Sequence, residues 1–261
     1  MQTTQHVKRH DILGTPVDDV DLDSALARIT GWLQEPATSL HHVVTVNPEF
    51  VIAARRDAHF RGVLQRSALA TADGVGIPIA ARILKLPVRA RVTGVDLVEG
   101  IAGIAPTNNR MFLLGAGEGI ASEAAGALKR RFPAVDIVGT HAGSPEDATF
   151  EDIDQRLAQT RPTVLLVAFG HPRQDLWIDR HRERLGEHGI LVAVGVGGAF
   201  DYLSGRVPRA PRLVRRLGFE WLYRLARQPW RWRRQLALPL FVLLVFRERV
   251  RRIRRNNEES S

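Results

Sequence analysis

The sequence of 261 residues contains no cysteine, which excludes disulfide bonds and thiolate metal sites and is typical of a reducing compartment. The polar segment from Met1 to His10 lacks the apolar core of a signal peptide, so none is expected. The apolar run at residues 236–246 contains Pro239 and is shorter than the roughly 20 residues that span a bilayer. We therefore expect a cytoplasmic protein that meets a membrane only at its surface.

Several common chemical signatures are also missing. The sequence has neither a P-loop nor a GxSxG elbow, and its nine histidines show no metal-ligand spacing. The triplets Asp19-Val-Asp21 and Asp21-Leu-Asp23 resemble the metal-binding DxD motif of many glycosyltransferases. They precede a predicted helix at residues 24–33, and we interpret these acids as helix caps.

Lysine is absent from residues 206–261, but this segment contains 16 arginines and four acids. Its charge of +12 exceeds the +9 of the whole chain, which leaves about −3 for residues 1–205. Arginine beside apolar residues favours binding to phosphate or to an anionic membrane, although a solvated basic face is an alternative. Nucleic acid is another candidate partner, but the slightly acidic remainder argues against a DNA-wrapping surface.

Short apolar runs alternate with amphipathic segments in the first 205 residues. Residues 43–46 predict a strand, and Asn47 followed by Pro48 predicts the start of a helix. Further strands are predicted at residues 68–72, 111–114, 135–139, 163–169 and 190–196. Helices are predicted at residues 75–84, 120–132, 149–160 and 172–185. This alternation predicts an α/β fold with a largely parallel sheet that is covered by helices.

The C-terminal segment is expected to be a separate unit. Pro208 and Pro211 interrupt the pattern near residue 205, and helices are predicted at residues 213–226 and 230–255. We divide the chain into an α/β domain at residues 1–205 and a helical, arginine-rich appendage at residues 206–261.

Ligands of open α/β sheets bind beyond the carboxyl ends of the strands, where Asp73 follows a predicted strand. The carboxylate has two interpretations, as the N-cap of the next helix or as a general base. The turn at residues 115–119 is either a tight strand–helix connection or a phosphate site; its GxGxG spacing differs from the dinucleotide fingerprint. The small residues from Gly195 to Asp201 suit either a bend after a strand or close approach to a ligand.

Eight motifs in order resemble the WecG/TagA/CpsF family of bacterial glycosyltransferases, over about residues 11–246. The motifs are Thr45-Val-Asn47, Ala72-Asp-Gly74, Arg91-Val-Thr-Gly-Val-Asp96, Phe112-Leu-Leu-Gly115, Pro172-Arg-Gln174 with Trp177, Gly195-Val-Gly-Gly-Ala-Phe-Asp201, Arg209-Ala-Pro211 and Leu217-Gly-Phe-Glu-Trp-Leu-Tyr-Arg224. The loop Gly170-His-Pro-Arg-Gln-Asp175 departs from the commoner pattern of a small residue, Lys before Gln, and then Glu. The departure concerns sugar or acceptor preference more than reaction class.

The resemblance implies a Rossmann-like domain that transfers a sugar from UDP to a lipid-linked acceptor with inversion and without a metal or other cofactor. The usual sugar is N-acetylmannosamine or its uronic acid, and the usual acceptor is polyprenyl-diphosphate-GlcNAc, joined through a β-1,4 linkage. The products of such reactions belong to cell-surface polysaccharides or teichoic acid linkage units. Glucosyl and glucuronosyl transfer in exopolysaccharide synthesis stay open.

The resemblance also implies roles for individual residues. Asp73 matches the proposed catalytic base, and the sugar and acceptor pocket matches Thr45, Asn47, Arg91 and Gln174. The nucleotide and its diphosphate are assigned to Gly115, Gly117, Gly198, Asp201, Arg224, Arg231 and Arg234. Without a metal, arginine must neutralise the departing diphosphate, and its planar fork suits phosphate.

The implied enzyme is peripheral on the inner face of the cell membrane, with its appendage on anionic lipid. Self-association is an alternative way to cover the apolar part of the appendage. Two other classes remain as rivals: a non-catalytic nucleic-acid-binding protein that uses the arginines, and a nicotinamide dehydrogenase. No nucleic acid is expected if the resemblance holds.

Overall fold

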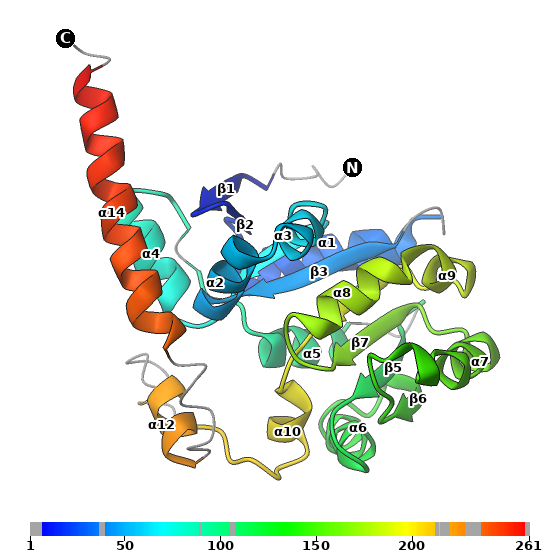
Figure 1. Ribbon diagram of the computed structural model, residues 1–261. Coiled ribbons are helices and arrows are strands. Elements are labelled where there is room, and N and C mark those ends of the chain that lie inside the picture. The colour runs from blue at the N-terminus through cyan, green and yellow to red at the C-terminus, as the bar shows by residue number, and fades with distance from the viewer. Residues whose placement is uncertain are drawn as a thin grey trace.

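The computed structural model describes residues 7–36, 40–88, 90–104, 108–211, 214, 220–227 and 236–258. Its centre is a six-stranded sheet in the order β4-β3-β8-β7-β5-β6, in which every neighbouring pair is parallel (Figure 1). The strands are β3 (His41–Val46), β4 (Leu69–Ala72), β5 (Arg110–Gly115), β6 (Asp136–His141), β7 (Val164–Ala168) and β8 (Val192–Gly195). The predicted α/β class with a parallel sheet is confirmed.

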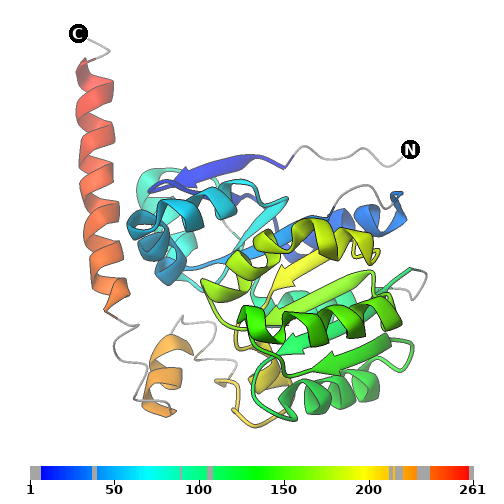
Figure 2. The same ribbon diagram turned by 45° about the vertical axis from the view of Figure 1, so that its right-hand side comes forward.

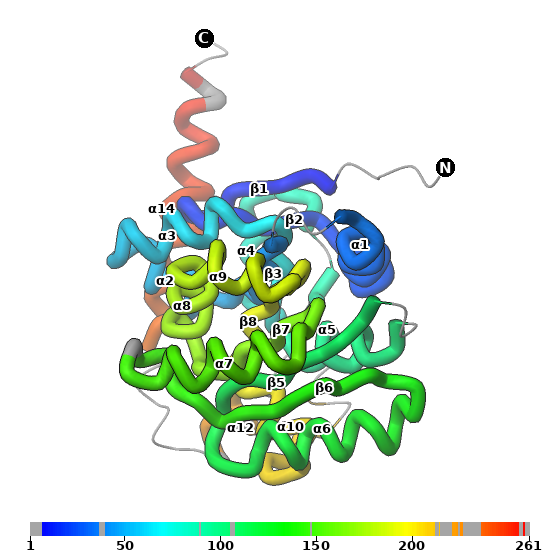
Figure 3. The backbone as a smooth tube through the Cα atoms, turned by 90° about the vertical axis from the view of Figure 1, so that its right-hand side faces the viewer, coloured from blue at the N-terminus to red at the C-terminus, as the bar shows by residue number. Residues whose placement is uncertain are grey.

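Helices cover both faces of this sheet (Figure 3). One face carries α1 (Leu22–Gln34), α5 (Gly94–Ala102), α6 (Ile120–Arg131) and α10 (Ala199–Leu203). The other carries α2 (Pro48–Arg56), α3 (Ala58–Gln65), α7 (Phe150–Thr160) after the short turn η1 (Asp147–Thr149), α8 (Arg173–Arg180) and α9 (Arg182–Glu187). Successive residues of a strand face opposite layers, so Leu113 and Leu114 of β5 belong to different cores. This double burial explains the near-continuous apolar strands.

An antiparallel hairpin of β1 (Arg9–Ile12) and β2 (Thr15–Asp18) lies against strand β4. The buried carboxylate of Asp18 accepts a 2.7 Å hydrogen bond from the backbone N–H of Ala70 in β4. The guanidinium of Arg9 holds the same carboxylate through two 2.8 Å hydrogen bonds. The hairpin therefore satisfies a backbone hydrogen-bond donor of the edge strand β4, which would otherwise be open to pairing with another chain.

Two predicted helix caps are confirmed. The side chain of Asn47 accepts hydrogen bonds from the backbone N–H groups of Glu49 and Phe50, at 2.9 and 3.1 Å. The carboxylate of Asp21 accepts a 2.8 Å hydrogen bond from the backbone N–H of Ser24 and caps α1. This agrees with the interpretation of the acids in the DxD-like triplets as helix caps.

The appendage contains α12 (Glu220–Arg227) and α14 (Ala237–Glu258), and α14 runs beside α4 (Gly76–Leu84) and α2 (Figures 1 and 2). Phe241 and Val245 of α14 are 3% and 1% exposed and join the apolar core of α2 and α4. On the outward side, Leu243 and Phe246 are 55% and 53% exposed. The expected lipid contact of the appendage therefore does not include the inner face of the run 236–246, which packs on the protein. In the described part of the chain, no helix is long and apolar enough to cross a membrane.

Candidate active site

A cavity of about 420 Å³ opens where the parallel strands end, as expected for an open α/β sheet. Residues that follow β3, β4, β5, β7 and β8 line it, together with the first residues of α2, α4, α5 and α10. Helix N-termini carry a partial positive charge and unpaired backbone N–H groups. Their convergence gives the cavity a backbone field that favours an anionic group such as a diphosphate.

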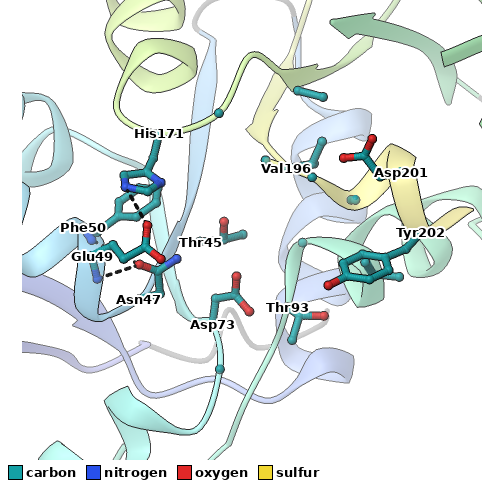
Figure 4. A pocket seen from close by; sticks show the side chains of 18 of the residues that line it. Thr45, Asn47, Glu49, Phe50, Asp73, Thr93, His171, Val196, Asp201 and Tyr202 are labelled. Carbon is teal, nitrogen blue, oxygen red and sulfur yellow. Dashed lines mark hydrogen bonds and ion pairs between the residues drawn. The ribbon is translucent and has the colours of Figure 1, made fainter. Parts of the chain in front are cut away.

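Asp73 lies in this cavity immediately after β4, and its carboxylate points into the space (Figure 4). Its backbone N–H donates a 2.7 Å hydrogen bond to the carbonyl of Val46, which ties it to the end of β3. Helix α4 begins at Gly76, and its N-cap residue is Val75 without a side-chain cap bond. The N-cap interpretation of Asp73 is therefore wrong, and the general-base interpretation stays a prediction.

The predicted pocket residues Thr45 and Asn47 line the cavity and also hold its walls together. The buried hydroxyl of Thr45 donates to the carbonyl of Gly195 at 3.1 Å and joins the ends of β3 and β8. The side-chain oxygen of Asn47 caps α2, while its amide nitrogen lies on the cavity side (Figure 4). That nitrogen takes no part in the cap and faces the space where a ligand would bind.

Gln174 borders the cavity but is only 1% exposed. Its side-chain oxygen accepts hydrogen bonds from the backbone N–H groups of Gly170 and Gly197, at 3.1 and 3.0 Å. The predicted pocket residue thus fastens two cavity loops to each other. The next residue of α8 is Asp175, and its fully buried carboxylate lies 3.3 Å from Nε2 of the fully buried His42. Burial raises the pKa of the Asp175 carboxyl.

Among the residues that the structure describes, two arginines line the cavity, the predicted Arg91 and the unassigned Arg209. Arg209 donates a 3.1 Å hydrogen bond to Asp96, which also forms a capping box with Thr93 at the start of α5. Burial favours a higher pKa for the Asp96 carboxyl, but the hydrogen bonds from Thr93 and Arg209 outweigh it, and the pKa is lowered. A carboxylate thereby orients one cation at the cavity wall.

The predicted nucleotide-site residues are only partly brought together. Gly117, Gly198 and Asp201 line the cavity, whereas Gly115 does not. A Cβ at Gly115 would lie 2.9 Å from the carbonyl carbon of Ala168, so this glycine instead permits close packing of β5 on β7. The neighbouring turn residue Ala116 does line the cavity.

The appendage contributes to the cavity through two residues to which the sequence analysis assigned no role. Trp221 of α12 and Leu238 at the start of α14 line it. Arg224 lies in α12, but its side chain falls outside the described parts of the chain, as do Arg231 and Arg234 entirely. Their assignment to a diphosphate stays a prediction.

The cavity wall also contains a histidine–glutamate pair that the sequence analysis did not predict, because the two residues are far apart in the sequence. Nε2 of His171 lies 3.3 Å from Oε2 of Glu49, and both side chains line the cavity (Figure 4). The imidazole also stacks on Phe50, with 5.0 Å between ring centroids. In the described ranges, no group of three or more acids and histidines is arranged to hold a metal ion.

The fold and the cavity define an α/β protein whose ligand site combines carboxylates, arginines and converging helix N-termini. The family model described as Glycosyl transferase WecG/TagA/CpsF family matches residues 10–255. The chain therefore belongs to the WecG/TagA/CpsF family of glycosyltransferases. Membership of an enzyme family decides against both the non-catalytic nucleic-acid-binding protein and the dehydrogenase.

Relatives in three bacteria carry the name N-acetylglucosaminyldiphosphoundecaprenol N-acetyl-beta-D-mannosaminyltransferase. The protein of Bacillus subtilis (strain 168) is 33% identical over 79% of each chain. That of Bacillus spizizenii is 31% identical over 89% of this chain and 90% of its own. The protein of Staphylococcus aureus (strain MW2) is 30% identical, with the same coverage. The chain, like these relatives, is a glycosyltransferase.

Proposed function

We propose that this enzyme transfers N-acetylmannosamine, or its uronic acid, from a UDP-sugar to polyprenyl-diphosphate-linked GlcNAc. The observation that carries the proposal is the position of Asp73, whose carboxylate points into the cavity between two groups of polar side chains (Figure 4). Asn47, Glu49 and His171 lie on one side of it. Asp201 and Tyr202 lie on the other side. A base between two substrate compartments suits transfer between two bound molecules. The names of the relatives support both the sugar and the acceptor.

In the proposed reaction, Asp73 removes the proton from the attacking hydroxyl of the acceptor as that oxygen bonds to the anomeric carbon. The bond from the anomeric carbon to the UDP oxygen breaks on the opposite face, and UDP leaves with the electron pair. A single displacement inverts the configuration and requires one carboxylate. The product is a β-linked disaccharide on the polyprenyl diphosphate.

The departing diphosphate is proposed to be stabilised by positive groups of the protein, without a metal or other cofactor. Arg91 and Arg209 line the cavity, and helix N-termini converge on it. The appendage adds Arg224, Arg231 and Arg234 in the proposal. Asp201, beside Gly198, is assigned to the nucleotide.

The acceptor is carried by a membrane, and the outward face of α14 is the proposed membrane contact. Leu243, Phe246 and Val250 are about half exposed there, and exposed arginines follow them in the same helix. Arginine near an anionic surface contributes about 1 kcal/mol per residue. We place the enzyme on the inner face of the cell membrane, with self-association of this face as the alternative.

A substrate panel tests the function. The purified protein is incubated with a polyprenyl-diphosphate-GlcNAc analogue and, separately, with UDP-linked N-acetylmannosamine, N-acetylmannosaminuronic acid, glucose and glucuronic acid. We expect a β-linked disaccharide from one of the first two donors, in the presence of a chelator. Transfer of glucose or glucuronic acid alone would contradict the proposed donor sugar. The absence of any transfer to the analogue would contradict the proposed acceptor.

A further inference from the structure

The wall of the cavity beside Asn47 holds a pair that the reaction above does not use. Glu49 lies in the first turn of α2, and His171 lies in the loop after β7. Their Oε2 and Nε2 atoms are 3.3 Å apart, and their side chains are only 19% and 17% exposed. Phe50 covers one side of the imidazole by stacking. These contacts fix both polar groups at the cavity wall.

The position of the pair relates it to the acceptor. It lies on the side of Asp73 away from Asp201 and Tyr202 (Figure 4). Helix α2, which carries Glu49, packs against α14, and Leu238 of α14 lines the same cavity. The outward face of α14 is the proposed membrane contact, so a lipid-linked acceptor would enter the cavity from the side of α14.

The charge of the pair decides which part of the acceptor it suits. A glutamate carboxylate beside an imidazole has a net charge of zero when the histidine is protonated and −1 when it is neutral. Neither state attracts a diphosphate. A carboxylate acceptor next to an imidazole N–H donor instead matches sugar hydroxyl groups, each of which donates and accepts hydrogen bonds.

We propose that Glu49 and His171 bind hydroxyl groups of the acceptor sugar and set its recognition, an inference that rests on the proposed function. Asn47 contributes its amide nitrogen to the same wall. The pair orients the acceptor ring so that the attacking hydroxyl faces Asp73. Discrimination follows because an analogue that lacks one hydroxyl loses the hydrogen bond that this hydroxyl makes to the pair.

Steady-state kinetics with the full chain test this assignment. Glu49→Gln and His171→Ala are compared with the wild type, and His171→Gln keeps a side-chain N–H donor. His59→Ala, at an exposed position of α3, serves as the matched control. We expect KM for the acceptor to rise about tenfold in the first two variants, with KM for the donor unchanged. Partial rescue by His171→Gln is expected, with the melting temperatures of all variants near that of the wild type.

Acceptor analogues that lack one hydroxyl other than the attacked one give a second readout. The wild type is expected to discriminate against at least one analogue by about tenfold, and His171→Ala or Glu49→Gln should lose that discrimination. If the folded variants keep the acceptor KM and the discrimination of the wild type, the proposed role of this pair is overturned, while the proposed function is unaffected. A wild-type protein that does not use the acceptor would instead refute the proposed function.

Discussion

The side-chain oxygen of Gln174, in the first turn of α8, accepts a 3.0 Å hydrogen bond from the backbone N–H of Gly197 in the loop after β8. A second bond, from the backbone N–H of Gly170, holds the loop after β7 to the same oxygen. One amide therefore holds two loops that together form much of the cavity wall. Its effect on substrates is through backbone position, since the side chain is almost fully buried.

Gln174→Ala removes the side-chain oxygen that accepts these hydrogen bonds and leaves two backbone N–H groups without that partner. We expect a loss of about 1–3 kcal/mol in the free energy of unfolding. We also expect a fall in kcat of about 10²-fold, because loops displaced by about 1 Å misalign the substrates. Denaturant unfolding and initial rates measure both effects. A stability and a rate equal to those of the wild type would contradict the role of this side chain in holding the two loops.

Phe241→Ala tests the packing of α14 on the α/β domain. This side chain is 3% exposed in the core of α2 and α4, so its truncation should cost about 3–5 kcal/mol. Leu243→Ala on the outward face of the same helix is the matched control, with an expected cost within about 0.5 kcal/mol. Equal melting temperatures for Phe241→Ala and the wild type would show that α14 does not dock there.

Removal of residues 206–261 tests the proposed domain boundary and the contribution of the appendage. The truncated chain loses Trp221 and Leu238 from the cavity and exposes the surface under Phe241. We expect it to retain the far-ultraviolet circular dichroism of an α/β protein but almost no transfer activity. Full activity of this fragment would contradict the idea that the appendage completes the site.

Stability at acid pH should depend on Asp154. Hydrogen bonds from Arg184 hold the pKa of its carboxyl at about 2, below the usual value, and His188 adds a 2.7 Å contact. A lowered pKa means that the ionised form is favoured in the folded state. Its contribution is therefore present above about pH 4 and is lost as the pH falls toward 2. Melting curves of the wild type and Asp154→Asn should differ at pH 6 and converge near pH 2, and a constant difference would contradict this linkage.

The alternation of strands and helices was predictable because strands buried on both faces leave apolar runs that amphipathic helices separate. The caps at Asp21 and Asn47 were predictable because capping needs only neighbouring residues. The hairpin from Arg9 to Asp18 was missed, since its two strands have four residues each and include polar side chains. Its stability comes from tertiary contacts with β4, which local sequence does not reveal.

The site residues also divide into those that the sequence predicts and those that only the folded structure reveals. Asp73, Asn47 and Asp201 were found because each follows a strand or lies in a small-residue loop at the end of one. Glu49 and His171 are brought together only by the adjacency of α2 to the loop after β7. Gln174 was found, but its bonds to Gly170 and Gly197 required the folded backbone. The packing of the inner face of α14 on the protein was not predicted, because an apolar run looks the same whether it meets lipid or protein.

Asp73→Asn tests whether the Asp73 carboxylate is the base of the glycosyl transfer. Asparagine is nearly isosteric but cannot accept the proton from the attacking hydroxyl. We measure UDP release with a donor and acceptor that the wild type uses, together with the melting temperature and donor binding. We predict a fall in kcat of about 10²–10⁴-fold with folding and donor binding intact. Turnover near that of the wild type would contradict it.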